Sequence, residues 1–197
     1  MKNILMTLPL LIFCFTVSQA QSYLAVTSNK ANLRDFPDKE SEVLDLLDKN
    51  VNLFVYSLEA TNDYYQVIEI DTDQEGWIHK SLVKIIKELP RSTQSPFNPE
   101  GNTGGYDCII EVTNNTDLSL TLKMNSGYHY FDPQETKTLN FAPGSYKYTA
   151  SAPSVTPYFG DENLMSGYKY SWTFYVETEY VNGGSRKRYY SKRKRRR

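Results

Sequence analysis

The residue of most evident chemical interest is a cysteine that follows an aspartate, in the pair Asp107-Cys108. A thiol acts as a nucleophile when a nearby base and a helix N-terminus lower its pKa. Here the cysteine is followed by the β-branched run Ile109-Ile110-Glu111-Val112, and the nearest histidine downstream is His129. We therefore interpret Cys108 as a buried strand thiol and the chain as non-enzymatic, with a cysteine peptidase as the minor alternative.

Metal chemistry finds little support in the sequence. The run Asp71-Thr72-Asp73-Gln74-Glu75-Gly76 is similar to the first half of a calcium loop, but Leu82 stands where the bidentate glutamate would be needed. The chain has 2 histidines, too few and too isolated for a zinc site. We expect a solvated hairpin loop at residues 71–76, no metal and no cofactor.

The C-terminus is a dense run of positive charge. Residues 186–197 contain nine of the 22 basic residues of a chain whose net charge is −1, so an acidic body precedes a basic tail. The tail has no apolar periodicity, and we predict that residues 182–197 are disordered. Its candidate polyanion-binding residues are Arg186, Lys187, Arg188, Lys192, Arg193, Lys194, Arg195, Arg196 and Arg197. An anionic envelope surface is the functional interpretation, and a solvated tail without a fixed partner is the alternative.

The N-terminus has the pattern of a signal peptide. Lys2 precedes an apolar segment, Ile4–Val17, and Ser18-Gln19-Ala20 offers the small residues that a signal peptidase needs. The segment of about 14 residues is short of the roughly 20 that span a bilayer. We predict cleavage after Ala20 and export to the periplasm or the cell surface, which argues against nucleic acid as a partner. Membrane anchoring and lipidation of Cys14 remain alternatives.

Composition favours strands and two domains. The chain has 16 Tyr and 9 Phe among 197 residues, and aromatic residues are enriched in β-sheets. Residues 21–87 and 106–181 are rich in short apolar runs, whereas residues 88–105 are rich in Pro, Gly and polar residues. We predict an all-β protein with a signal peptide at 1–20, domains at 21–87 and 106–181, a flexible linker at 88–105 and a tail at 182–197.

The second domain shows the alternation of half-buried strands. Leu118, Leu120, Leu122 and Met124 share one face of a strand, and Tyr170, Trp172, Phe174 and Val176 share one face of another. Pro143-Gly144 separates two further strand patterns. About six such strands predict an antiparallel β-sandwich. A two-proline loop at residues 152–160 carries Tyr158 and Phe159, two candidate ligand-binding residues.

The first domain carries an ordered set of motifs over about 65 residues. Ala31-Asn32-Leu33-Arg34 leads to Pro37, Tyr64-Tyr65-Gln66-Val67 starts a strand, and Gly76-Trp77-Ile78 closes the block with Leu82 shortly after. This order resembles the bacterial SH3 (SH3b) family, which implies an SH3-like β-barrel. Asn50 replaces a common turn glycine, which is tolerable because asparagine also adopts positive φ. Gly76 lets the chain turn closely before the last strands, and Trp77 can cover one end of the barrel. We expect Arg34 to form a surface ion pair with Asp35 or Asp38.

The resemblance implies a binding protein of the bacterial cell envelope. The expected partner is a peptidoglycan peptide or an envelope protein, and the candidate ligand-binding residues of the barrel are Phe36, Tyr56, Tyr64, Tyr65 and Trp77. A protein–protein assembly module that acts through the Tyr-rich second domain is the first alternative. An accessory cell-wall cysteine peptidase is the second.

Overall fold

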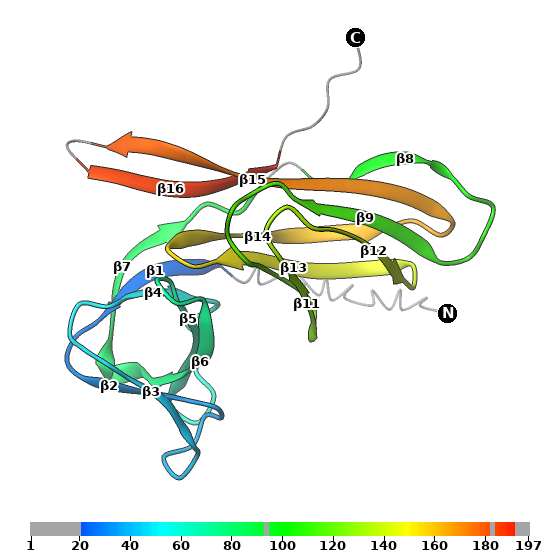
Figure 1. Ribbon diagram of the computed structural model, residues 1–197. Coiled ribbons are helices and arrows are strands. Elements are labelled where there is room, and N and C mark those ends of the chain that lie inside the picture. The colour runs from blue at the N-terminus through cyan, green and yellow to red at the C-terminus, as the bar shows by residue number, and fades with distance from the viewer. Residues whose placement is uncertain (1–20, 93–94, 182–183, 192–197) are drawn as a thin grey trace, which may run out of the picture.

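The computed structural model describes residues 21–92, 95–181 and 184–191, with side chains described as far as Val176. Its regular elements are strands, apart from one short 3-10 turn, and the all-β prediction is confirmed (Figure 1). The predicted signal peptide lies outside the described residues. Within the described ranges no helix has the length and apolarity that crossing a membrane requires.

The first domain is one strongly curved sheet. Its strands pair in the order β3-β2-β6-β5-β4-β1-β7, so that the sheet wraps around a small core (Figure 1). The elements are β1 (Ser22–Thr27), β2 (Ala31–Arg34), β3 (Val43–Leu47), β4 (Asn52–Val55), β5 (Tyr64–Glu69), β6 (Gln74–His79), η1 (Lys80–Leu82) and β7 (Val83–Leu89).

The barrel core is built from aliphatic residues at alternate positions. Fully buried members include Leu33, Leu53, Val67 and Ile78. Strand β6 shows the alternation clearly, because Gly76 and Ile78 face inward whereas Trp77 is half-buried on the outer face. The expectation that Trp77 caps one end of the barrel is therefore wrong, since its neighbours in the strand already occupy the inward positions.

Two sequence details of the barrel can be checked directly. Asn50 has a φ of 67°, which confirms that asparagine serves where a glycine is common. Gly76 does not turn the chain as expected, since it lies inside β6. A Cβ on Gly76 would lie 2.8 Å from the carbonyl oxygen of Arg34, so the glycine is needed for the close approach of β2.

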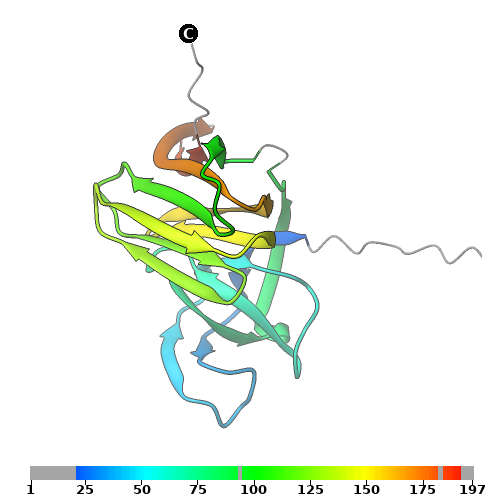
Figure 2. The same cartoon turned by 90° about the vertical axis from the view of Figure 1, so that its right-hand side faces the viewer.

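The second domain is built in two layers (Figures 1 and 2). One layer holds β8 (Asn98–Asn102), β9 (Cys108–Asn114), β12 (Thr136–Phe141), β15 (Tyr168–Val181) and β16 (Gly184–Ser191). The other holds β10 (Leu120–Met124), β11 (Gly127–Phe131), β13 (Gly144–Ala152) and β14 (Val155–Leu164). Within the described residues, the backbone pairing that joins the two layers is one parallel bridge, between Thr156 of β14 and Arg188 of β16.

The core of this domain lies between the layers and is largely aromatic. Trp172 is 1% exposed and packs against Phe97, Phe174 and Tyr148 at ring separations of 4.4, 4.0 and 5.2 Å. The prediction of a purely antiparallel arrangement is wrong, because β15 pairs with β9 in parallel from Lys169 to Phe174. The chain reaches β15 only after building the opposite layer, and it then re-enters the first layer in the direction of β9.

The predicted linker is wrong over much of its length. Leu89 ends β7, Phe97 is 3% exposed in the second core, and β8 pairs with β15. The polar composition of the segment concealed this role, because only two of its residues contribute large apolar side chains to a core, namely Leu89 at the end of β7 and Phe97 between Pro96 and Asn98. The predicted disordered tail is also wrong in part, because the backbone of β16 pairs with β15 from Gly184 to Ser191. Residues 192–197 lie outside the described residues.

The two domains are packed against each other. The layer of β10, β11, β13 and β14 lies over the outer face of the barrel (Figures 1 and 2). Phe159 of β14 packs edge-on against Phe54 of β4 at 5.4 Å, in a small core of its own. That core also contains Leu24, Ile68, Ile70 and Leu89. The outer barrel face is apolar here, so the second domain covers surface that would otherwise meet water.

Candidate functional site

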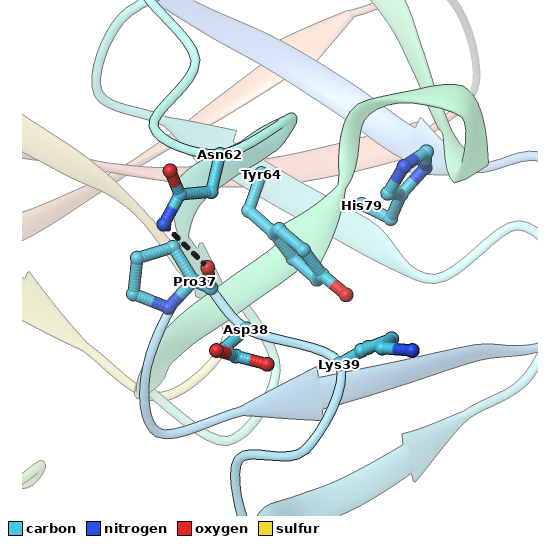
Figure 3. A pocket seen from close by; sticks show the side chains of 6 residues that line it. All are labelled: Pro37, Asp38, Lys39, Asn62, Tyr64 and His79. Carbon is cyan, nitrogen blue, oxygen red and sulfur yellow. Dashed lines mark hydrogen bonds between the residues drawn. The ribbon is translucent and has the colours of Figure 1, made fainter.

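A pocket of about 360 Å³ opens on the first domain. It is lined by Pro37, Asp38, Lys39, Asn62, Tyr64 and His79. Figure 3 shows the Tyr64 ring between Pro37 and Asn62 on one side and His79 on the other. The lining comes from three parts of the chain, namely the loop after β2, the turn before β5 and the end of β6.

The first wall is a loop that the sequence holds in shape through its own polar groups. Arg34 Nη1 donates to the carbonyl oxygen of Ser41 at 2.6 Å, and the Phe36 amide donates to Ser41 Oγ at 2.9 Å. Asp38 Oδ1 accepts the amide of Glu40 at 2.8 Å. The expected surface ion pair of Arg34 with Asp35 or Asp38 is therefore wrong, since the guanidinium braces the pocket loop instead.

The second wall is a tight turn with two residues at positive φ, Asn62 at 49° and Asp63 at 67°. Asn and Asp adopt this conformation more readily than other non-glycine residues. Asn62 Nδ2 donates to the carbonyl oxygen of Pro37 at 3.3 Å and so ties the turn to the first wall (Figure 3). Lys80 Nζ lies 2.7 Å from Asp63 Oδ1, and this ion pair lowers the pKa of Asp63 and raises that of Lys80.

The floor is formed by Tyr64 and His79, whose rings meet edge to face at 5.3 Å. Tyr64 is 8% exposed and therefore fixed, and His79 Nδ1 lies 2.8 Å from Ser81 Oγ. Asp38 and Lys39 place opposite charges at the rim. The pocket can accept and donate hydrogen bonds, offers a ring surface, and has a charge for an amine and one for a carboxylate.

The structure brings together only part of the predicted barrel site. Tyr64 lines the pocket, and Phe36 lies in the pocket loop with 63% of its surface exposed. Trp77 stands two residues before His79 on the same outer face of β6. Tyr65 points the other way and packs against the barrel core, and Tyr56 lies under the second domain with Lys123 Nζ 4.7 Å above its ring.

The prediction of a ligand platform at Tyr158 and Phe159 is wrong. Phe159 is 7% exposed between the domains, and the Tyr158 hydroxyl donates to Ser92 Oγ. The surrounding residues form strand β14 rather than a long loop, because the chain turns tightly at Ser154, with a φ of 61°. Among the side chains that the structure describes, the exposed rings of the second domain belong to Tyr106, at 70% exposure, and to Tyr128 and Tyr130 on β11, which are parallel within 8° at 6.4 Å.

Several pocket residues were missed by sequence reasoning, namely Pro37, Asp38, Lys39, Asn62 and His79. These residues are mostly polar and belong to turns, whereas the sequence motifs that predict a binding site here are aromatic. The run Asn62-Asp63 was the available signal, since it marks a tight turn directly before a strand that starts with two aromatic residues.

Cys108 is a buried strand thiol, as predicted. It lies in β9 with no exposed surface, and its Sγ donates to the carbonyl oxygen of Met165 at 3.1 Å. Burial raises the pKa of this thiol, which is the opposite of what a nucleophile needs. Within the described residues, no group of three or more His, Cys, Asp or Glu is placed to hold a metal ion.

The predicted tail site cannot be placed. Arg186, Lys187 and Arg188 belong to the backbone of β16, and the basic residues from Lys192 onward lie outside the described residues. The polyanion-binding residues therefore stay a prediction.

Comparison with known families bears on the barrel alone. Residues 29–84 match the family described as the bacterial SH3 domain, and this range covers β2 to the start of β7 together with the whole pocket. No curated protein matches the chain. The motifs, the curved sheet and the family match agree, and residues 29–84 of this chain are a bacterial SH3 domain.

Proposed function

We propose that this protein is an exported, non-enzymatic binding protein of the bacterial cell envelope, and that its SH3 pocket holds a cell-wall peptide. The main support for this proposal is the composition of the pocket. Asp38 and Lys39 offer opposite charges at the rim of a floor made by Tyr64 and His79. A short peptide with free amines and carboxylates complements this arrangement, because each charged end finds a partner and its aliphatic part meets a ring.

The test is binding to purified cell wall and to soluble peptides released from it. Asp38→Asn combined with Lys39→Gln removes both rim charges without touching the buried floor. We expect at least a tenfold loss of affinity, in line with the removal of charge-assisted hydrogen bonds at about 1.5–3 kcal/mol each.

The matched control is Lys30→Gln combined with Asp48→Asn. These residues form an exposed ion pair at 3.5 Å elsewhere on the same domain, so the control removes the same charges outside the pocket. It should bind like the parent chain. Equal binding by the pocket variant and the control would remove the cell-wall peptide from this pocket.

A protein partner that binds through the second domain is the second candidate. It is favoured by the parallel exposed rings of Tyr128 and Tyr130, which are 42% and 65% exposed. Exposed tyrosines provide large contact area at low conformational cost. Lys137 Nζ donates to the carbonyl oxygen of Tyr130 at 2.6 Å and so occupies one acceptor on the backbone edge of β11, and contact with a partner would use the ring faces.

Export is part of the proposal and has its own test. N-terminal mass analysis of the protein recovered from the envelope should find Gln21 as the first residue. A chain that retains residues 1–20, or one lipidated at Cys14, would contradict cleavage after Ala20.

A further inference from the structure

The contact between the domains is organised around the tip of the β5–β6 hairpin. The carbonyl oxygen of Ile70 accepts the amide of Ser154 from the second domain at 2.7 Å. Three residues further on, Asp73 adopts a φ of 63° and directs its side chain at β10, where Oδ2 accepts a hydrogen bond from Thr121 Oγ1 at 2.9 Å. The loop predicted to be solvated is therefore a docking element, because its carboxylate meets the other domain.

The other oxygen of that carboxylate, Oδ1, lacks a good hydrogen bond. Asp73 Oδ1 is buried and accepts no hydrogen bond of normal geometry from the described residues, although the Ser151 hydroxyl lies near enough to lower the pKa of this carboxyl. A buried polar atom without a partner costs free energy, and the cost rises when the atom shares a negative charge. Such an atom calls for an explanation in terms of what could satisfy it.

The charged groups around Asp73 do not neutralise it. Lys123 follows Thr121 by two residues on β10, but its Nζ is bound to Glu75 Oε1 at 2.5 Å and lies over the rings of Tyr56 and Tyr128. The carboxylate of Glu69 on β5 accepts hydrogen bonds from the backbone amides of Asp71 and Thr72, at 3.1 and 2.8 Å. Asp71 itself is exposed.

These surroundings favour the neutral acid. Burial raises the pKa of Asp73 above its ordinary value, and the negative charge of Glu75 raises it further. The hydroxyls of Ser151 and Thr121 oppose this effect without cancelling it. Geometry and electrostatics thus agree that the carboxylate is under-stabilised in the docked arrangement.

We propose that Asp73 acts as a proton-operated clasp between the two domains, so that their contact tightens when the carboxyl takes up a proton and loosens when it ionises. The direction follows from linkage. A carboxyl whose pKa is higher in the docked state binds its proton first in that state, so docking gains stability as pH falls through the raised pKa. The gain levels off below the ordinary aspartate pKa of about 3.9, where both states are protonated. This inference is independent of what the SH3 pocket binds.

The test is hydrogen exchange of the Ser154 amide in the full chain, corrected for the intrinsic effect of pH, between pH 8 and pH 4. This amide reports directly on docking because its acceptor belongs to the other domain. We expect protection to rise on acidification by up to about tenfold per pH unit across the titration of Asp73. In Asp73→Asn, protection should be at least as high at pH 8 as in the parent chain and nearly independent of pH. Asparagine also tolerates the positive φ, so the variant adds no backbone strain.

Asp71→Asn is the matched control, since it removes the same charge from the same loop at an exposed position. It should keep the pH dependence of the parent chain. Titration of the Asp73 carboxyl carbon by NMR in the unmodified chain gives a readout that needs no variant, and it should show a pKa above 3.9. The clasp would be overturned if protection of the Ser154 amide did not change with pH. It would also be overturned if Asp73→Asn kept the pH dependence of the parent chain, or if the Asp73 carboxyl titrated at its ordinary pKa.

Discussion

Gly76 shows how a single residue limits what the barrel can tolerate. It stands in the middle of β6, where a Cβ would meet the Arg34 carbonyl oxygen and the Leu33 side chain, each at 2.8 Å. The Arg34 carbonyl oxygen is a backbone atom and cannot move aside as a flexible side chain can. Any residue larger than glycine at position 76 must therefore push β2 away from β6. The pocket loop begins directly after β2, and the effect of such a push would reach the binding site.

Gly76→Ala should therefore lower the free energy of unfolding by about 1–3 kcal/mol, the usual cost of overpacking. Gly105→Ala is the control, because its Cβ would meet only Thr103 Oγ1 at an ordinary 3.6 Å. Chemical unfolding of both variants measures the difference. Equal stability of the two would show that β2 and β6 have room to separate.

The two tryptophans differ in environment, and so should their variants. Trp172 is buried in the second core, and Trp172→Ala should cost about 3–5 kcal/mol of stability. Trp77 is half-buried on the outer face of the barrel, and Trp77→Ala should cost roughly 1 kcal/mol. Urea unfolding monitored by circular dichroism compares them without depending on tryptophan emission. A larger loss at Trp77 than at Trp172 would contradict the described packing.

Among the elements, β14 serves two cores at once. Val155 and Leu164 are buried between the layers of the second domain, whereas Phe159 is buried against the barrel. This one strand therefore contributes side chains both to the core of the second domain and to the interface with the barrel. A change on its barrel side tests docking with little disturbance of the second core.

Phe159→Ala should destabilise the chain by about 3 kcal/mol and separate one cooperative unfolding transition into two. Phe36→Ala provides the control, because it deletes the same ring from a position that is 63% exposed and should cost less than about 0.5 kcal/mol. Calorimetry records both the stability and the number of transitions. A single transition in Phe159→Ala would mean that the remaining contacts suffice for coupling.

The basic tail is best tested with β16 left in place. Deleting residues 192–197 removes six basic residues and spares the backbone pairing of β15 with β16. If the tail is an anchor, this deletion should reduce attachment to anionic vesicles by at least a hundredfold at low salt, because each basic residue near such a surface contributes about 1 kcal/mol. Sedimentation with vesicles at low and high salt gives the measurement. Unchanged, salt-insensitive attachment would identify the tail as a solvated end.

Local patterns predicted the strands and failed where a contact joins distant segments. The alternation of Leu120, Leu122 and Met124 marked β10 correctly, because a half-buried strand repeats every two residues. The pocket was out of reach, since Asp38 and Asn62 become neighbours only when two turns meet in space. Strand β8 was missed for a related reason, as its Pro-Gly-Asn composition is typical of a linker and β15 supplies the pairing.

At the scale of the whole molecule, the second domain covers an apolar patch on the outer face of the SH3 domain. Leu24, Phe54, Ile68 and Ile70 share one buried cluster with Phe159 of the adjoining layer. A barrel of about 65 residues has little stability to spare. The domain boundary inferred from the sequence therefore divides the barrel from a second domain that shares one apolar interface with it.

Residues 21–89 expressed alone should fold, as the complete motif set indicates, but with a lower melting temperature than the full chain and a tendency to self-associate through the uncovered patch. Amide dispersion in NMR tests folding, and light scattering tests association. Phe54→Ser in the isolated domain should reduce the association. A monomeric domain as stable as the full chain would show that docking contributes nothing to the barrel.

The parallel pairing of β9 with β15 sets the order in which the molecule can assemble during synthesis. Strand β9 leaves the ribosome long before its partner, because about 60 residues, which include all four strands of the opposite layer, lie between Ile109 and Lys169. Until β15 emerges, β9 has β12 on one side and an open edge on the other, and Trp172 is missing from the core. The hairpins of the second layer can form early from local contacts, whereas closure of the domain is a late event with a high loop-closure cost. A nascent chain in this interval carries an exposed strand edge, so chaperone dependence and aggregation should be highest just before β15 is complete.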